Sequence, residues 1–280
     1  MPSFKQVTIV GLGLIGGSLG MAIRQKRLAQ TVVGFSRKPE TMKRAKARGA
    51  IDAATADLVE AVLDADLVIL AAPISQIISL GQKAAKAMKP GSILTDVGST
   101  KGEIVRALEH AVPQRVAFVG AHPIAGSELS GIDAASADIF DAGYCILTPT
   151  PRTDPAALKQ VESLWKAIAS RVVRMNVLSH DRRLAVGSHL PHLLAFILTA
   201  MLPKDFEVPR SFVEMTRIAK SDPDLWIDIF ASNRKALIDA FNSFEANGQR
   251  LATLLQQGRY KVLRRELARI QSIRKSLDRT

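Results

Sequence analysis

The chain has 280 residues, a length that fits one or two folded domains, and 47% of them are hydrophobic while 23% are charged. This balance excludes a disordered chain, a collagen-like fibre and a small protein held together by disulfides. The net charge of +12 admits an anionic partner such as nucleic acid. The single cysteine, Cys145, cannot form an intrachain disulfide, so we expect a cytoplasmic protein. The first residues lack the ordered regions of a signal peptide, and we expect none.

Short apolar runs alternate with amphipathic stretches over the first half of the chain. We expect strands at Val7–Val10, Val32–Phe35, Leu67–Ala71, Ile93–Asp96, Ala117–Val119, Cys145–Thr148 and Val172–Met175. The first four intervening stretches are long enough for crossover helices, at residues 15–27, 39–48, 75–88 and 101–110. This alternation predicts an α/β fold, a doubly wound parallel sheet of the Rossmann type with helices on both faces.

A glycine-rich segment, GLGLIGGSLG, lies between the first strand and the first helix. It contains a GxGxxG pattern at Gly11, Gly13 and Gly16, with Leu14 and Ile15 inside it. In this position Gly11 permits a tight turn, Gly13 lets the backbone approach a pyrophosphate, and Gly16 allows close packing of helix on strand. We therefore predict dinucleotide binding at these five residues, while a merely glycine-rich turn is the alternative.

The end of the second strand bears on which dinucleotide binds. An NAD site usually has Asp or Glu there to bind the ribose hydroxyls. This chain has Ser36, Arg37 and Lys38 instead. Because a guanidinium and a hydroxyl can bind a 2′-phosphate, we predict NADP rather than NAD. The alternative is that Arg37 and Lys38 are solvated loop residues.

Two later strands are followed by polar segments. TDVGSTKG, with Ser99, follows Ile93–Asp96, and GAHPIAGSELSG, with His122, follows Ala117–Val119. Ligands of open α/β sheets bind beyond the carboxyl ends of the strands, so His122 is well placed beside a nicotinamide. A lone histidine can equally be structural.

From Ser179 onward the sequence shows helical patterning and no convincing strand. We place a domain boundary here, with a dinucleotide-binding domain at 1–178 and a helical substrate and dimerisation domain at 179–280. Ser179 or Asp181 could cap the first helix of the second domain.

Residues 184–202 carry no Asp, Glu, Lys or Arg over 19 positions. That length is near the ~20 apolar residues that span a bilayer, but the segment contains two histidines and a proline, and we favour a helix buried in protein over a membrane span. Such a helix must be covered on every side. We therefore expect two chains to share it in a homodimer.

The C-terminal residues 259–280 hold eight basic and two acidic residues, a local excess of +6 that is half of the total. Apolar side chains recur there at helical spacing, at Leu263, Leu267, Ile270, Ile273 and Leu277. This pattern predicts a basic amphipathic helix with a solvated face. Attraction of an anionic substrate is the alternative role of the charge, and we expect no nucleic-acid partner.

Polar side chains within the helical half are candidates for ligand binding. His189 and His192 are three residues apart and share a helix face. No HExxH pattern or cysteine cluster accompanies them, so we expect no metal. Arg217 lies among apolar and small residues, where it could bind a substrate carboxylate or form a structural salt bridge.

Five segments in this order, GLGLIGGSLG, TDVGSTKG, GAHPIAGSELSG, SHLPH and TRIAKSDPDLW, resemble the prephenate/arogenate (cyclohexadienyl) dehydrogenase family of tyrosine biosynthesis. The resemblance covers nearly the whole chain. It implies oxidation of the ring 4-hydroxyl of a cyclohexadiene, with hydride transfer to NAD(P) and loss of the ring carboxylate as carbon dioxide. Prephenate and arogenate differ only in a keto or amino side chain, and the sequence does not choose between them.

The resemblance also implies roles for single residues. His122 accepts the proton of the 4-hydroxyl, and Ser99 helps to hold His122 and that hydroxyl. Arg217 binds a substrate carboxylate. The other residues that the resemblance brings to the site are His192 and His189 from the helical half, Ser127 and Glu128 on a loop facing substrate, and Ala72 and Pro73 on the nicotinamide side.

Other reductases with a helical domain, of the β-hydroxyacid dehydrogenase or imine reductase type, share the expected architecture. Their usual catalytic lysine would need a motif that we do not find. We also expect no regulatory domain after Thr280, while inhibition by tyrosine as a competing product stays open.

Overall fold

The structure is a computed structural model that describes residues 4–125, 129–203 and 207–277. The chain divides into two compact units, Met1–Arg234 and Lys235–Thr280. The predicted boundary at residue 178 lies inside the first unit, because the helices after it pack against the α/β part. A division by function at 178 stays a prediction.

The main sheet has six parallel strands in the order β3-β2-β1-β4-β5-β6. They are β1 (Phe4–Val10), β2 (Ala29–Phe35), β3 (Ala53–Thr55), β4 (Leu67–Leu70), β5 (Ile93–Asp96) and β6 (Ala117–Val119). Strand order reverses between β1 and β4, which confirms the doubly wound Rossmann-type sheet. Only β3 was not predicted, since three residues are too few to show a pattern.

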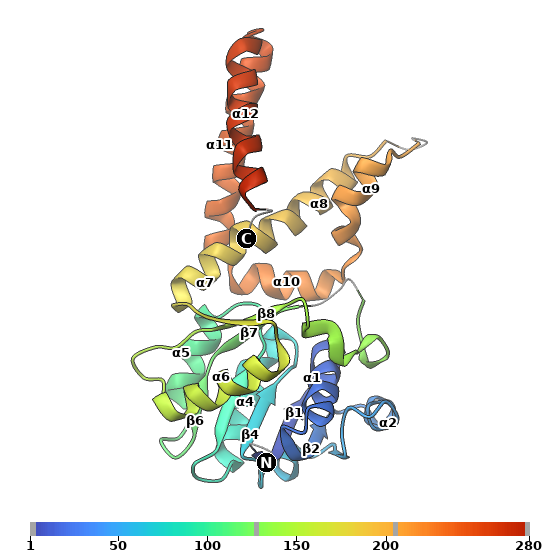
Figure 1. Ribbon diagram of the computed structural model, residues 1–280, viewed down its shortest axis with the longest axis vertical. Coiled ribbons are helices and arrows are strands. Elements are labelled where there is room, and N and C mark those ends of the chain that lie inside the picture. Colours follow the sequence, from blue (N-terminus) through green and yellow to red (C-terminus); the bar gives the residue numbers. More distant parts are fainter. Residues whose placement is uncertain (1–3, 126–128, 204–206, 278–280) are drawn as a thin grey trace. The chain divides into compact units, whose positions relative to one another are not determined.

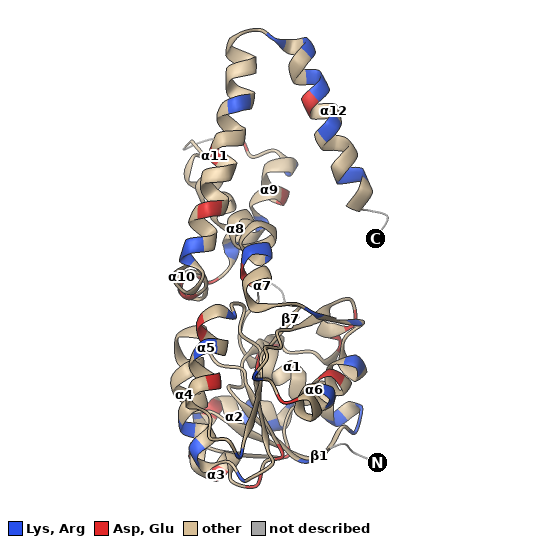
Figure 2. Cartoon of the chain, turned by 90° about the vertical axis from the view of Figure 1, so that its left-hand side faces the viewer, with Lys and Arg blue, Asp and Glu red and all other residues tan. Residues whose placement is uncertain are grey.

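Helices cover both faces of this sheet, as Figure 2 shows. They are α1 (Leu14–Gln25), α2 (Pro39–Ala47), α3 (Leu58–Val62), α4 (Ile74–Ala87), α5 (Gly102–Ala111) and α6 (Pro155–Ile168). One apolar core joins α1, α2 and α6 to the sheet, and a second joins α3, α4 and α5 to its other face. The four predicted crossover helices are all present.

A second, smaller sheet corrects one expectation. The strands predicted at 145–148 and 172–175 do not extend the main sheet but form β8 (Tyr144–Leu147) and β9 (Arg171–Arg174) of a three-stranded sheet. Its third strand, β7 (Ala121–Ile124), runs antiparallel to β8. Apolar runs of four residues reveal a strand but not its partner, which explains the error. His122 consequently lies within a strand rather than in a turn.

The helical part of the first unit occupies residues 177–232 (Figure 1, yellow to orange). It consists of α7 (Val177–Leu184), a π-helical turn (Ala185–His189), α8 (Leu190–Ala200), α9 (Arg210–Thr216), a 3-10 turn (Arg217–Lys220) and α10 (Pro223–Ser232). As predicted, the described residues after 177 contain no strand. The cap of α7 is neither Ser179 nor Asp181 but Asn176, whose side chain accepts a hydrogen bond from the Ser179 amide at 2.8 Å.

The predicted uncharged segment is a helix only partly buried by this chain. In α8, Leu190 and Ala195 are buried, whereas Ile197 and the following Met201 are exposed. Within the part of the chain that the structure describes, no helix combines the length and the apolar character needed to cross a membrane.

The second unit is a pair of helices, α11 (Arg234–Gln256), all but the first residue of which belongs to this unit, and α12 (Tyr260–Ser276). The turn between them contains Gly258, whose φ of +64° favours glycine. Arg250 and Glu266 form an ion pair of 3.3 Å across the two helices. Figure 2 marks the Lys and Arg positions along α12 in blue. Four residues of the predicted apolar stripe are exposed, Leu267, Ile270, Ile273 and Leu277.

Candidate active site

The glycine-rich loop has the shape of a pyrophosphate site. Gly11 has a φ of +104°, and a Cβ there would lie 2.4 Å from the Ala71 carbonyl oxygen. A Cβ on Gly16 would lie 1.9 Å from the Gly11 carbonyl oxygen, so the close approach of α1 to the loop requires both glycines. A Cβ on Gly13 would meet nothing within 4 Å, which leaves open space next to the backbone. The N-terminus of α1 has no side-chain cap and no acidic residue in its first turn. Its amides at Leu14 and Ile15 therefore suit a phosphate.

The end of β2 lies beside this loop, since the Gly11 amide donates to the Phe35 carbonyl at 3.0 Å. Arg37 is exposed and donates from Nη2 to Gln76 Oε1 on α4 at 3.1 Å. The Ser36 hydroxyl accepts a hydrogen bond from the Lys38 amide at 3.2 Å. The guanidinium is thus held by a neutral partner, which leaves its charge available to an anion.

The turn after β4 completes the dinucleotide groove. Ala72 is partly buried, and Pro73 precedes α4 as its N-cap residue. The Ala71 amide donates to the Val10 carbonyl at 2.8 Å, which joins this turn to the end of β1. The carboxyl ends of β1, β2 and β4 therefore meet around the glycine-rich loop, where a doubly wound sheet binds nucleotides.

A cavity of about 710 Å³ holds most of the other predicted site residues. Its lining includes Ser99, His122, His189, His192 and Arg217. The small sheet, α7, α8 and α10 contribute the remaining walls, among them Ile146, Met175, Leu225 and Trp226. Two further candidates, Ser127 and Glu128, lie outside the described residues.

His122 belongs to a chain of buried hydrogen bonds. Its Nδ1 lies 2.9 Å from Nε2 of His180, and Nδ1 of His180 lies 2.8 Å from Oδ1 of Asp181. The carboxylate of Asp181 also accepts the amides of Lys101 at 2.9 Å and Gly102 at 2.8 Å. His180 and Asp181 were not predicted as site residues, because nothing in their sequence neighbourhood marks them.

A buried ion pair lies behind this chain. Lys101 and Asp96 are both fully buried and paired with each other. Lys101 Nζ also donates to the Ala121 carbonyl at 2.8 Å, and Asp96 Oδ1 accepts the Ala121 amide at 3.3 Å. The residue next to His122 is therefore held by both members of the pair.

Burial lowers the pKa values of the histidines in this hydrogen-bonded chain. Burial, aided by the positive charges of His180 when protonated and of Lys101, holds the pKa of His122 well below its ordinary value. Burial also lowers the pKa of His180, against the raising effect of Asp181. Burial raises the pKa of Asp181, but hydrogen bonds from His180 and the amides of Lys101 and Gly102 outweigh it and keep that pKa below the ordinary value.

Two histidines, from the π-turn and α8, also line the cavity. The His192 ring stacks on the Trp226 ring, with centroids 3.5 Å apart. His189 is buried, which lowers its pKa to about 4, and its Nδ1 lies 3.2 Å from Nδ2 of Asn233. The indole nitrogen of Trp226 is buried without a hydrogen-bond partner among the described residues. The sequence analysis quoted Trp226 within a motif but gave it no role.

Ser99 and Arg217 both line the cavity. Ser99 is partly buried beyond β5, and no hydrogen bond joins the side chains of Ser99 and His122, both of which the structure describes. His180 therefore holds the Nδ1 side of His122. Arg217 begins the 3-10 turn before α10, with an exposed side chain on the cavity.

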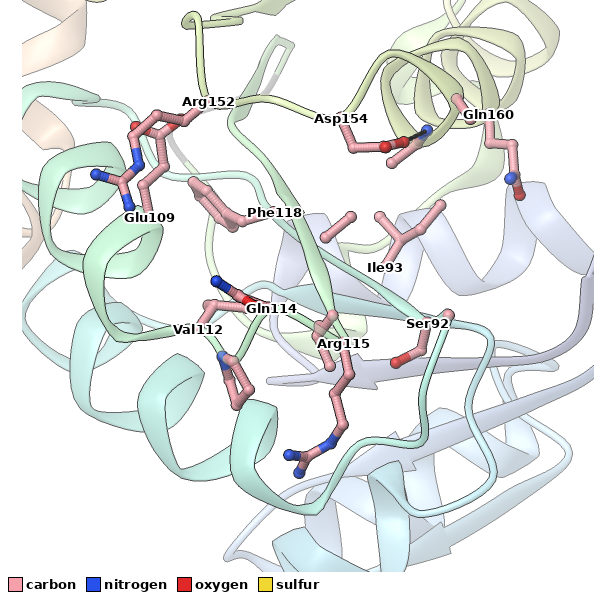
Figure 3. A pocket seen from close by; sticks show the side chains of 16 residues that line it. Ser92, Ile93, Glu109, Val112, Gln114, Arg115, Phe118, Arg152, Asp154 and Gln160 are labelled. Atoms are coloured by element: carbon pink, nitrogen blue, oxygen red, sulfur yellow. Dashed lines mark hydrogen bonds between the residues drawn. The ribbon is translucent and has the colours of Figure 1, made fainter.

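A second cavity, of about 460 Å³, lies at the amino ends of β5 and β6 (Figure 3). Polar side chains such as Arg115, Arg152 and Gln160 line it. Ligands of doubly wound sheets bind at the carboxyl ends of strands, so this cavity is not our candidate site. Among the described residues, no group of three or more His, Cys, Asp or Glu side chains is arranged to hold a metal ion.

Two family models match consecutive parts of the chain. The model for the nucleotide-binding domain of prephenate dehydrogenase matches residues 19–174, and the model for its dimerization domain matches residues 177–269.

Curated relatives agree with these models. The chain is 35% identical to a cyclohexadienyl dehydrogenase of Zymomonas mobilis, over 93% of this chain and 92% of that protein. It is 33% identical to a prephenate dehydrogenase of Bacillus subtilis, over 90% of this chain and 70% of that protein.

Solved structures are similar over the whole length. A prephenate dehydrogenase from A. aeolicus, in complex with hydroxyphenyl propionate and NAD+, has a TM-score of 0.90 at 32% identity and covers 98% of both chains. A Synechocystis arogenate dehydrogenase has a TM-score of 0.83 at 28% identity, over 97% of this chain and 99% of that one. The two family models cover nearly all of the sequence, and the curated relatives agree with them. The chain therefore belongs to the prephenate dehydrogenase family, whose members are oxidoreductases of aromatic amino acid biosynthesis that use a nicotinamide dinucleotide.

Proposed function

We propose that the protein oxidatively decarboxylates arogenate, prephenate or both, with hydride transfer to NADP, and forms tyrosine or 4-hydroxyphenylpyruvate. The observation that carries this proposal is His122, a buried neutral base on the 710 Å³ cavity beyond the strands of a dinucleotide-binding sheet. When bound, the nicotinamide would accept a hydride from the ring carbon that bears the hydroxyl.

The protein's part in the reaction is to take and return one proton. Nδ1 of His122 is engaged by His180, which leaves Nε2 to accept the proton of the substrate hydroxyl. Loss of the ring carboxylate as carbon dioxide then leaves its electron pair in the ring, and the new phenolate oxygen takes the proton back. We assign Ser99 to the same hydroxyl, and Arg217 to a substrate carboxylate, by position on the cavity.

The other proposed contacts follow the same geometry. His189 and His192 line the same cavity, and we assign them to contacts with the substrate ring and side chain. Ser127 and Glu128 lie outside the described residues, and their contact with substrate stays a prediction. The dinucleotide would lie along the loop of Gly11, Gly13, Leu14, Ile15 and Gly16 and reach Ala72 and Pro73 with its nicotinamide.

NADP is the cofactor we propose, on the strength of Arg37, Ser36 and Lys38 at the end of β2. The second strand ends without the carboxylate that binds a ribose diol, and Arg37 is held in place by Gln76. The similar A. aeolicus enzyme was crystallised with NAD+, so the choice needs a direct test.

Initial rates of the purified enzyme with four pairings test the function. Prephenate or L-arogenate is offered with NADP or NAD, and we expect turnover with at least one substrate and a higher kcat/KM with NADP. A kcat/KM for NAD equal to or above that for NADP would reject the cofactor assignment. If folded protein turned over no pairing, the proposed reaction itself would be wrong.

Replacement of Arg37 tests the 2′-phosphate contact. Because charge-assisted hydrogen bonds contribute about 1.5–3 kcal/mol, Arg37→Ala should raise the KM for NADP by roughly 10- to 100-fold. The KM for NAD should hardly change. Lys43→Ala removes the same charge from an exposed position on α2 and serves as the control. If both variants raised the KM for NADP equally, Arg37 would act only through its positive charge and not through a specific contact with the 2′-phosphate.

Replacement of His122 tests the base. His122→Asn should lower kcat by roughly 10²–10⁴, the usual contribution of a positioned acid–base group. His110→Asn, at an exposed position on α5, should retain the wild-type rate. Near-wild-type turnover by His122→Asn would remove His122 from the mechanism.

The pH profile adds an independent check on His122. Only the neutral imidazole can accept a proton, and burial holds the pKa of His122 below its ordinary value. Activity should therefore rise with pH and already be constant above about pH 6.5, the ordinary histidine pKa. A further rise in activity above that pH would indicate that a different group is the base.

We further propose a homodimer formed through the helical residues 179–280, with the dinucleotide domain at 1–178. The family model that matches 177–269 is described as a dimerization domain, and the exposed apolar residues of α8 and α12 support the same assignment. Sedimentation at micromolar concentration should give about twice the chain mass of 30.3 kDa. A species of single-chain mass would contradict the dimer. The cytoplasm stays the predicted location.

A further inference from the structure

We propose that His180 and Asp181 are positioning residues that fix the tautomer of His122, with its proton on Nδ1 and its lone pair on Nε2, and that stabilise His122 while it holds the substrate proton. This proposal rests on the proposed function for its kinetic consequences. Its structural part, the position of one proton, does not depend on any substrate. Neither residue was among the site residues that the sequence indicated.

The inference begins at Asp181, which accepts hydrogen bonds and donates none. Its two oxygens accept the backbone amides of Lys101 and Gly102, at the start of α5. Both amides can only donate, and the first turn of a helix favours a negative charge. An ionised Asp181 satisfies all these contacts, in agreement with its lowered pKa.

The proton positions on both rings then follow. Nδ1 of His180 must donate to Oδ1 of Asp181, 2.8 Å away, because an ionised carboxylate is only an acceptor. In neutral His180, Nε2 is consequently the acceptor. Nδ1 of His122, 2.9 Å from that atom, must carry the proton, which leaves Nε2 of His122 unprotonated. A base for a substrate hydroxyl requires this tautomer.

Charged groups on the neighbouring elements explain why a carboxylate is needed. Lys101 on the α5 side opposes a positive charge on His122, and His189 when protonated would do the same. Asp96 is paired with Lys101, and Asp181 faces His180 and through it His122. The negative charge of Asp181 therefore offsets Lys101 at the moment when His122 becomes an imidazolium.

The proton inventory balances over the reaction. The O–H bond of the substrate breaks and Nε2 of His122 gains that proton, while the hydride goes to the oxidised nicotinamide dinucleotide. The Nδ1 proton of His122 strengthens its hydrogen bond to His180, backed by Asp181. After carbon dioxide leaves, the phenolate oxygen takes the proton from Nε2, and His122 returns to its starting tautomer, while His180 keeps its own throughout.

The direct test is the tautomer itself. The chain has five histidines, so long-range ¹⁵N–¹H correlation of the labelled, full-length wild-type protein can resolve each ring, with His122→Asn and His180→Gln used for assignment. We expect His122 and His180 both to be protonated on Nδ1 and bare on Nε2 at mildly alkaline pH. A His122 ring protonated on Nε2 would overturn the proposal, whatever the activity.

Two substitutions at His180 separate positioning from packing. His180→Phe keeps a planar ring but removes the acceptor, so kcat should fall by roughly 10²–10⁴ with little change in KM, comparable to the effect of losing a tautomer-fixing partner elsewhere. His180→Gln can accept from His122 with Oε1 and donate to Asp181 with Nε2, so it should stay within about tenfold of wild type. His110→Phe, an exposed histidine on α5, is the matched control and should be unaffected.

The outcomes remain distinct if a variant folds poorly. Wild-type kcat in His180→Phe would overturn the proposal, and so would equal losses in His180→Phe and His180→Gln, because packing alone would then explain both. If His180→Phe is unfolded, the kcat of Asp181→Asn and the tautomer of the wild-type protein decide. The NH2 group of the asparagine would face a hydrogen-bond donor, so kcat of Asp181→Asn should also fall. Failure of all four substrate pairings would refute the proposed function and leave the tautomer measurement standing.

Discussion

The arrangement of the site depends on one buried ion pair, Asp96 with Lys101. Asp96 ends β5, Lys101 precedes α5, and both bind the backbone of Ala121 at the start of β7. The pair therefore fixes the strand that carries His122 and the helix start whose amides hold Asp181. A buried charge left without its partner costs about 3–5 kcal/mol, so these elements keep one relative position.

Hydrogen bonds around Asp181 also make one cavity histidine, His122, an acceptor and another, His189, a donor. Asn233 must direct Nδ2 to the Asp181 carbonyl, 2.8 Å away, so this amide also faces Nδ1 of His189. Nδ1 of His189 then accepts, and its Nε2 carries the proton. With His122 protonated on Nδ1, the cavity presents an acceptor from the small sheet and a donor from the π-turn. A ligand with a hydroxyl at one end and an oxygen acceptor at the other suits this polarity.

Much of the fold could be predicted because its signals are local. The strands β4 and β5 and the second half of β1 are buried on both faces, so they appear as continuous apolar runs. The glycine-rich loop follows from the steric demands of one turn. The small sheet could not be assigned, since antiparallel pairing of β7 with β8 joins residues that a four-residue pattern cannot match. The same limit concealed β3.

The site residues also divide into those that a local sequence pattern marks and those that it does not. The phosphate loop follows β1, and His122 follows β6 by three residues, so both are near the carboxyl ends of parallel strands, where such a sheet predicts a ligand. His122 itself belongs to β7 of the small sheet. The partners of His122 lie elsewhere in the sequence: His180 is 58 residues away, and Asp181 is 80 residues from the Lys101 amide that it accepts. No periodicity links such positions, because their contact depends on how α7 packs against α5. A sequence can therefore mark His122 as a candidate base, but the hydrogen-bond partners of that histidine become visible only in the packed structure.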